Sequence, residues 1–173
     1  MGKKISIGQY ARKVAKMGPE MEAAAIRGVQ SAAYWLEGEA VDQLKGTRPY
    51  PPEDTGELVR SAKTTLIDRG AIVSFDAPHA AFIEYGTRPH MPPLQPLMDW
   101  AIRKGLADTE EEAKAVAWKI AQKIKREGTT PKFFLARAVK QLSRRRIVSR
   151  EIKAELKEAG LEVVTFSRKK PTS

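Results

Sequence analysis

The sequence predicts an α+β fold, with a long N-terminal helix, a small antiparallel β-sheet, further helices and a basic C-terminal extension. Apolar residues recur every three or four positions over residues 20–45. Two β-rich segments flank the turn signal Asp68-Arg69-Gly70, and helix starts and stops follow from residue 94 onward. A chain of 173 residues suits one domain, predicted over residues 1–160, with a terminal strand and basic tail over 161–173.

The N-terminal part is predicted to be helical in two pieces. Residues 7–17 form a short helix that Gly18-Pro19 ends, because proline suits the first turn of a helix and not its interior. A longer helix follows over residues 20–45. Tyr34 and Trp35 add a second apolar edge to it, which either meets another subunit or covers the core. The main apolar face of this helix consists of Met21, Ala25, Val29, Ala32, Leu36, Ala40 and Leu44.

A loop and a β-hairpin are predicted next. Residues 45–58, KGTRPYPPEDTGEL, are rich in proline and glycine and lack periodicity. Within them Asp54-Thr55-Gly56 predicts a tight turn in which the glycine adopts positive φ. Residues 61–68 and 71–76 are expected to pair as antiparallel strands. Because an isolated hairpin is marginal in water, a helix or further strands must cover one of its faces.

Residues 79–93, HAAFIEYGTRPHMPP, combine an apolar run with a proline-rich segment. Pro78 fits a helix N-terminus and Gly86 fits the position just beyond a helix C-terminus, so a short helix is predicted between them. Residues 87–93, the proline arm, must run extended because three prolines fix φ and lack the amide hydrogen. Gly86 then acts as a hinge between the helix and the arm.

Three more helices follow in the prediction. One begins at Leu94 and stops near Gly105. The next begins at a capping box formed by Thr109 and Glu112 and runs to Glu127. After a break at residues 128–131, the last helix continues through residues 151–160 and ends at Gly160. Its inward residues are predicted to be Phe134, Leu135, Ala138, Val139 and Leu142.

Composition excludes several classes of protein. Without cysteine the chain has no disulfide framework, thiolate metal site or cysteine nucleophile. No apolar run approaches the ~20 residues that span a bilayer, and the N-terminus MGKKISIGQY lacks the apolar core of a signal peptide. We therefore expect a protein made in a reducing cytoplasm, with no membrane contact.

Charge is distributed unevenly along the chain. Residues 1–113 hold 14 Lys and Arg against 16 Asp and Glu, a net charge of −2, whereas residues 114–173 hold 17 against 5, a net charge of +12. The excess forms either a solvated helical face or a surface that contacts a polyanion, such as nucleic acid or an acidic protein. The candidate contact residues are Arg144, Arg145, Arg146, Arg150, Arg168, Lys169 and Lys170.

Both histidines lie near one glutamate, which raises the question of a metal or catalytic site. A helical metal motif needs two histidines one turn apart, but His79 and His90 are eleven positions apart, with a glycine between them. No third histidine or cysteine completes a set with Glu84. Ser61 and Ser74 have no marked base beside them. We therefore expect neither an enzyme nor a bound metal or cofactor.

Three motifs in order carry a resemblance to a known family. DTGELVRS at 54–61, HAAFIEYGTRPHMPP at 79–93 and GTTPKFFLARAV at 128–139 together resemble the tail-completion, or head–tail joining, proteins of tailed bacteriophages and prophages. The resemblance covers roughly residues 20–142. Lys132, between Pro131 and Phe133, departs from the Pro-Phe-Leu pattern of that family, and residues beyond Ser143 have no counterpart.

The resemblance implies a structural role in the virion. Proteins of this family form rings, often of six copies, in the neck between the connector and the tail tube or its terminator, and have no catalytic activity. A homo-oligomer made in the host cytoplasm and incorporated into the virion is thus expected. The alternative is a basic DNA-binding or tail-assembly accessory protein of a mobile element. The residues expected to reach a neighbour are Tyr50, Asp54, Thr55, Gly56, Glu84, Tyr85, Gly86, Thr87, Arg88, Pro89 and His90.

Overall fold

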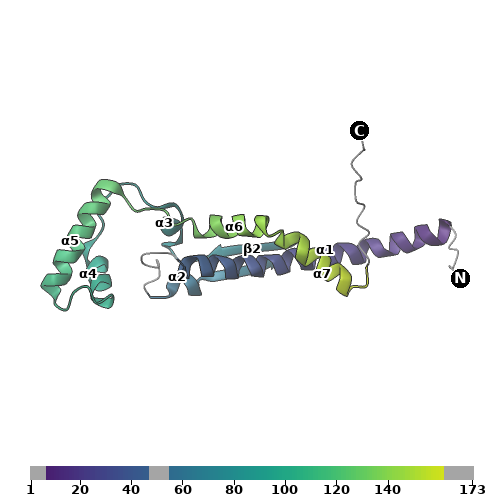
Figure 1. Cartoon of the computed structure of the whole chain (residues 1–173), viewed down its shortest axis with the longest axis horizontal. Coiled ribbons are helices and arrows are strands. Elements are labelled where there is room, and N and C mark those ends of the chain that lie inside the picture. The colour runs from purple at the N-terminus through teal and green to yellow at the C-terminus, as the bar shows by residue number, and fades with distance from the viewer. Residues whose placement is uncertain (1–6, 47–54, 162–173) are drawn as a thin grey trace, which may run out of the picture. The chain divides into compact units, whose positions relative to one another are not determined.

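The computed structural model describes residues 7–46 and 55–161, with side chains from residue 18 onward. It confirms the α+β class, with a long N-terminal helix, one antiparallel two-stranded sheet and further helices (Figure 1). The elements in order are α1 (Ile7–Lys45), α2 (Glu57–Arg60), β1 (Ala62–Ile67), β2 (Gly70–Phe75), α3 (Ala80–Tyr85), α4 (Leu94–Arg103), α5 (Glu110–Glu127), α6 (Phe134–Arg144) and α7 (Ile147–Glu158).

Helix α1 differs from the prediction because it is continuous. Figure 1 draws it as one ribbon from Ile7 to Lys45, with Pro19 in its interior, so the predicted break at Gly18-Pro19 is wrong. Although an interior proline lacks an amide donor and its ring crowds the carbonyl four residues earlier, α1 continues through Pro19. Ala32, Ala40 and Leu44 of the predicted face are buried, but Met21 is exposed.

The last predicted helix is also interrupted. Helix α6 ends at Arg144 and α7 begins at Ile147, with Arg146 between them in the left-handed region at φ 52°. No glycine or proline marks this break. The fully buried side chain of Ile147 holds the start of α7 against the protein, and this packing decides where the chain turns. The predicted strand beyond Leu161 lies outside the described residues.

Several other local predictions are confirmed. The hairpin turns at Asp68-Arg69, α5 begins at the capping box of Thr109 and Glu112, and Gly128 ends it at φ 73°. Among the inward residues predicted for α6, Phe134 and Ala138 are buried, whereas Val139 is exposed.

Contacts divide the chain into two compact units. The first comprises residues 1–37, 64–73 and 140–173, and the second comprises residues 38–63 and 74–139. Helix α1, the hairpin and α6 contribute residues to both. The single domain predicted over residues 1–160 stays a prediction.

In the first unit, α1 packs on α7 and on the hairpin. A Cβ added to Gly28 would lie 2.5 Å from the Cα of Ile152, so the two helices touch where α1 has no side chain. Arg27 forms an ion pair with Glu155 at 2.8 Å. The hydroxyl of Thr64 donates to the carboxylate of Glu37 at 2.5 Å, which ties β1 to α1.

In the second unit, α4 and α5 form a packed pair (Figure 1). Small side chains on α5 allow the close approach, since Ala113 and Ala117 are fully buried beside Met98. Elsewhere in this unit the ring of Phe75, at the end of β2, meets that of Phe134 edge to face with centroids 5.0 Å apart. Phe134 is the first residue of α6, so this contact anchors α6 to the sheet.

Candidate functional site

Two segments far apart in the sequence are hydrogen-bonded into one substructure in the second unit. Thr87 and Thr129 form an antiparallel bridge, in which each backbone amide donates to the other's carbonyl at 3.3 and 3.2 Å. Their hydroxyl oxygens lie 3.1 Å apart. We call the two segments, residues 80–90 and 128–138, the bridge module. It joins the second and third motifs of the phage resemblance.

Each bridging threonine follows a glycine that the bridge requires. Gly86 and Gly128 have φ of 71° and 73°, where side chains are rarely tolerated. A Cβ on Gly86 would lie 2.3 Å from the carbonyl oxygen of Thr129, and one on Gly128 would lie 2.0 Å from that of Thr87. Each glycine thus leaves room for the carbonyl of the opposite segment. Gly86, the predicted hinge, therefore has a positive φ that glycine adopts without strain.

Glu84 supplies the cap of a helix that cannot cap itself. Helix α6 follows Phe133, whose apolar side chain has no acceptor for the first amides of the helix. The Glu84 carboxylate accepts from the amides of Leu135 at 2.9 Å and Ala136 at 3.0 Å. Its side chain is buried, and a carboxylate is favoured at the positive end of a helix. Glu84 therefore holds α6 and is occupied within the chain.

Backbone contacts continue from Glu84 along α3. The amide of Phe133 donates to the carbonyl of Glu84 at 3.1 Å, and that of Lys132 donates to the carbonyl of Ile83 at 2.9 Å. Phe133 adopts φ 49°, which turns both amides toward α3. These bonds satisfy the last carbonyls of α3, which have no partner inside the helix. Lys132, the departure from the family pattern, is thus part of the bridge module.

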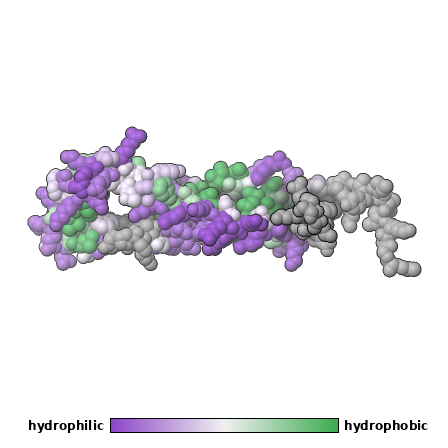
Figure 2. Space-filling model, turned by 45° about the horizontal axis from the view of Figure 1, so that its top comes forward, coloured by the Kyte–Doolittle hydropathy of each residue, from purple (hydrophilic) through white to green (hydrophobic). Residues whose placement is uncertain are grey.

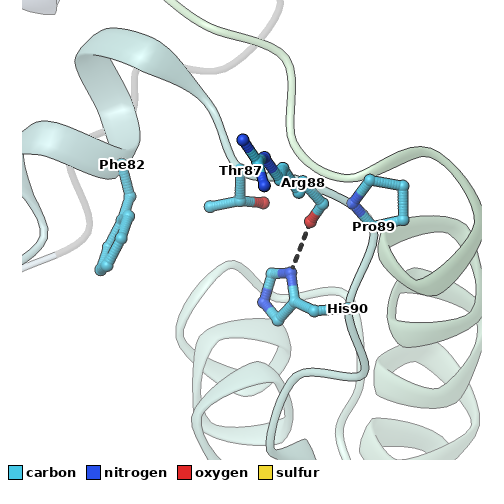
Figure 3. Close-up of a pocket in the computed structure, with 5 residues that line it drawn as sticks. All are labelled: Phe82, Thr87, Arg88, Pro89 and His90. Carbon is cyan, nitrogen blue, oxygen red and sulfur yellow. Dashed lines mark hydrogen bonds between the residues drawn. The ribbon is translucent and has the colours of Figure 1, made fainter.

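The outer side of the bridge module carries a shallow pocket of about 340 Å³. Figure 3 shows Phe82 of α3 on one side and His90 of the proline arm on the other, with Thr87 and Arg88 between them. Nδ1 of His90 lies 2.9 Å from the carbonyl oxygen of Arg88, which holds the imidazole in place. Pro89 completes the lining. The pocket therefore combines apolar rings with one cation.

Several large apolar side chains of the bridge module and the proline arm are exposed to solvent. Phe82 is 60% and Tyr85 is 72% exposed, although aromatic side chains are usually mostly buried. Three residues apart, they share one side of α3. Met91 and Phe133 are also exposed. Such a cluster is typical of a surface that binds another protein.

The structure places the other predicted contact residues as follows. Tyr50 and Asp54 lie outside the described residues, as do Arg168, Lys169 and Lys170. Thr55 is exposed, and Gly56 has φ 76° at the start of α2 as predicted. Arg88, Pro89 and His90 are exposed on the proline arm.

The arginines near the end of α6 are exposed, but two of them have partners. The guanidinium of Arg145 lies 5.9 Å from the ring centroid of Trp35, and Arg150 forms an ion pair with Glu151 at 2.9 Å. Arg144 and Arg146 have no ion pair with another described residue. The four arginines thus divide into two with a partner in the chain and two without an ion pair among the described residues.

Each candidate catalytic side chain has a separate structural role. The hydroxyl of Ser61 donates to the carbonyl of Leu58 at 2.8 Å, and that of Ser74 donates to Asp76 at 3.0 Å. His79 stands at the start of α3 and His90 bonds its own arm. Over residues 7–46 and 55–161, no three His, Cys, Asp or Glu side chains gather in a group able to hold a metal.

Sequence reasoning missed both the bridge and the buried cap. The repeated dipeptide Gly-Thr, at 86–87 and 128–129, was the available signal for the bridge. No local signal pointed to Glu84 as a cap, because the amides that it binds lie 51 and 52 residues further along the chain.

Comparisons with known proteins return nothing: no family model, curated protein or solved structure matches this chain. Within the described part of the chain, no helix is long and apolar enough to cross a membrane.

Proposed function

We propose that this protein is a structural component of a bacteriophage virion, a neck or tail-completion protein that forms a ring between connector and tail. The observation that carries the proposal is the bridge module. Two of the three motifs that resemble the tail-completion family are joined there by reciprocal Thr87–Thr129 bonds, and their outer surface displays Phe82 and Tyr85. A rigid, largely apolar surface suits protein contact.

The chemistry of the module favours contact over catalysis. Its buried carboxylate, Glu84, is held by two backbone amides, and its histidine bonds a carbonyl. Neither arrangement presents a base beside a nucleophile, which acyl or phosphoryl transfer requires. We therefore assign Tyr85, Arg88, Pro89 and His90 to a surface that meets a neighbouring copy, the connector, or the tail tube and its terminator.

Assembly without the protein tests this proposal. We expect particles from a phage or prophage lacking it to appear as full heads beside separate tails in negative-stain images. Normal virions would contradict the proposal. A chain in which only Tyr85 and Arg88 are replaced by serine is the matched variant, because both side chains are exposed and the fold is expected to survive. It should fail to restore joining.

The basic last third supports a second function, DNA binding by a free accessory protein of a mobile element. Arg144 and Arg146 carry charges with no ion pair among the described residues. Sizing the purified protein with and without DNA separates the two functions. A monomer that binds DNA in a salt-sensitive manner favours the accessory protein. A ring that forms without DNA, or a monomer that forms a ring only on tail tubes, favours the neck.

Within a neck ring, the same arginines face either the DNA channel or an acidic protein partner. We assign the helix arginines to protein contact and the basic tail to a flexible role. Reversal to glutamate at Arg144, Arg145 and Arg150 decides between them. Loss of head–tail joining supports partner contact, whereas intact joining with lost DNA retention or ejection contradicts it. Arg144→Glu alone is the sharper variant, because it leaves the Arg145–Trp35 contact and the Arg150–Glu151 pair intact.

A further inference from the structure

Among the residues that the structure describes, backbone hydrogen-bonding groups at both edges of the β-hairpin have no partner. The amide of Asp76 donates to the carbonyl of Ser61 at 3.2 Å, which places these residues in a hydrogen-bonded pair. Because such pairs alternate along an antiparallel ladder, Thr64 and Leu66 of β1 direct their amides and carbonyls away from β2. Ala71 and Val73 of β2 direct theirs away from β1. Each strand therefore has an edge that can accept a further strand.

No other part of the described chain covers these edges with backbone hydrogen bonds. The sheet has two strands, and the backbone bonds between separate segments elsewhere do not reach residues 64–66 or 71–73. The side chain of Gln30 donates only to the carbonyls of Ile67 and Gly70, at the turn end of the hairpin. With respect to residues 7–46 and 55–161, the two edges are open along most of their length.

Apart from Lys63 near the start of β1, the strands lack the features that usually protect an edge. Natural edge strands carry prolines, inward charges or bulges that discourage pairing. Residues 64–67, TTLI, and 70–75, GAIVSF, have neither charge nor proline. Ile67 and Ile72 are each about half exposed (49% and 54%). Figure 2 shows apolar surface gathered in patches between hydrophilic stretches of the visible face.

We infer that the hairpin is a self-association surface, in which β2 of one copy pairs antiparallel with β1 of the next. The occupant is a second copy because the hairpin itself supplies the strand that each edge needs. Strand β2 runs opposite to β1, so pairing β2 with β1 of another copy keeps all copies in one orientation. An interface of this kind is heterologous and can close into a ring.

Charge at the open end of the hairpin agrees with this pairing. Lys63 is exposed at the start of β1, and Asp76 is exposed just after β2. When two hairpins align without a shift, Lys63 of one copy approaches Asp76 of the next. No other charge lies along either strand, so two copies meet no like-charge repulsion there. Closure of the paired hairpins into a ring rests on the proposed neck function, whereas the pairing of β2 with β1 does not.

Cross-linking tests the pairing directly, because the chain has no cysteine of its own. Two variants are made, Thr65→Cys on β1 and Ile72→Cys on β2, with tags of different size. Both side chains are exposed, and a short bismaleimide spans a shift of two residues along the strands. We expect a mixed product when the two chains are combined and little product from either alone. Lys157→Cys, on the exposed side of α7, is the control that should not cross-link with either.

The outcomes separate the inference from the proposed ring. If Thr65→Cys chains cross-link to one another when no Ile72→Cys chain is present, the copies pair through a two-fold β1–β1 contact. That result overturns the heterologous arrangement. Rings that form without any hairpin cross-link overturn the inference and leave the neck proposal standing. A chain that stays monomeric and uncross-linked at all concentrations overturns the hairpin pairing, whereas the neck role is judged separately by head–tail joining.

A second variant removes one edge donor without disturbing the hairpin. The amide of Ala71 points outward, so Ala71→Pro deletes a donor that β1 does not use. We expect Ala71→Pro to lose self-association by size-exclusion chromatography while its circular dichroism matches the parent. Ala71→Ser retains the amide and should associate normally. Unchanged association in a folded Ala71→Pro would contradict the inference.

Discussion

The bridge module and the crossing of α1 with α7 both depend on missing side chains, but for different reasons. In the bridge module, Gly86 and Gly128 have positive φ, and each makes room for a carbonyl that receives a hydrogen bond. At the crossing, Gly28 lies in regular helix and makes room for the backbone at Ile152. One region is held by backbone conformation and polar bonds, the other by close contact of helices.

This difference teaches where each region is sensitive. Polar bonds at fixed geometry tolerate no change in the backbone that carries them, whereas packed helices relax by small shifts at some cost. We therefore expect changes in the bridge module to have larger effects than changes at the crossing. A module that keeps its shape is suited to present Phe82 and Tyr85 to a partner.

The largest effect is expected at Gly86. Gly86→Val adds backbone strain and overlap with the Thr129 carbonyl, each costing ~1–3 kcal/mol, so we expect a loss of about 4 kcal/mol in the free energy of unfolding. Urea denaturation measures it. Gly105→Val is the control, because Gly105 has φ 65° and open space around it, and only the strain applies. Equal losses of unfolding free energy in the two variants would show that the close approach of Gly86 to the Thr129 carbonyl is unimportant.

Glu84 comes next. Glu84→Ala leaves two amides at the start of α6 without an acceptor, and hydrogen bonds to charged groups contribute ~1.5–3 kcal/mol, so we expect a loss of about 3 kcal/mol. Glu84→Gln keeps one acceptor oxygen and should lose less. Thermal or urea unfolding checks the order. An unchanged free energy of unfolding in Glu84→Ala would show that the Glu84 cap does not stabilise the bridge module.

Gly28 tests the other region. Gly28→Ala places a methyl carbon against Ile152 and should destabilise by ~1–3 kcal/mol through overpacking. Gly38→Ala lies on the same helix with nothing within 4 Å, so it should stabilise by ~0.5–1 kcal/mol through helix propensity. Opposite signs in the two unfolding experiments would confirm that α1 and α7 touch at Gly28. A gain in both would contradict that contact.

A small effect on stability is expected from the exposed aromatics of α3. Phe82→Ser and Tyr85→Ser should change the free energy of unfolding by no more than ~0.5 kcal/mol, because both rings face solvent. In the proposed neck, they should nevertheless weaken binding to a neighbouring subunit or to the tail, measured by co-purification. Trp118→Ser on α5, a similarly exposed ring, is the control that should leave binding unchanged. Normal binding in both α3 variants would move the contact surface elsewhere.

The smallest effect is expected from metal removal. We expect a chelator to leave the melting temperature unchanged and elemental analysis to find less than stoichiometric zinc or manganese. Stoichiometric metal that His79→Ala abolishes would overturn this prediction. The expectation follows from the separation of His79 and His90, which serve the start of α3 and the proline arm.

The sequence by itself determined the elements whose signals lie within one turn or one loop. The capping box of Thr109 and Glu112 spans three residues, the hairpin turn spans two, and Gly86 follows its helix directly. Each is decided by local sterics and hydrogen bonds between near neighbours, so neighbouring letters suffice to predict it. The same holds for the α+β class.

Only the tertiary structure decided the features that join distant segments. The passage of α1 through Pro19, the left-handed turn at Arg146, the Thr87–Thr129 bridge and the capping of α6 by Glu84 all lack a local signal strong enough to predict them. The bridging threonines are 42 residues apart. Their hydrogen bonds form because the fold brings together two backbone segments in which glycine leaves room for the opposite carbonyl. Across such a distance, packing and not the neighbouring sequence decides which residue is the partner.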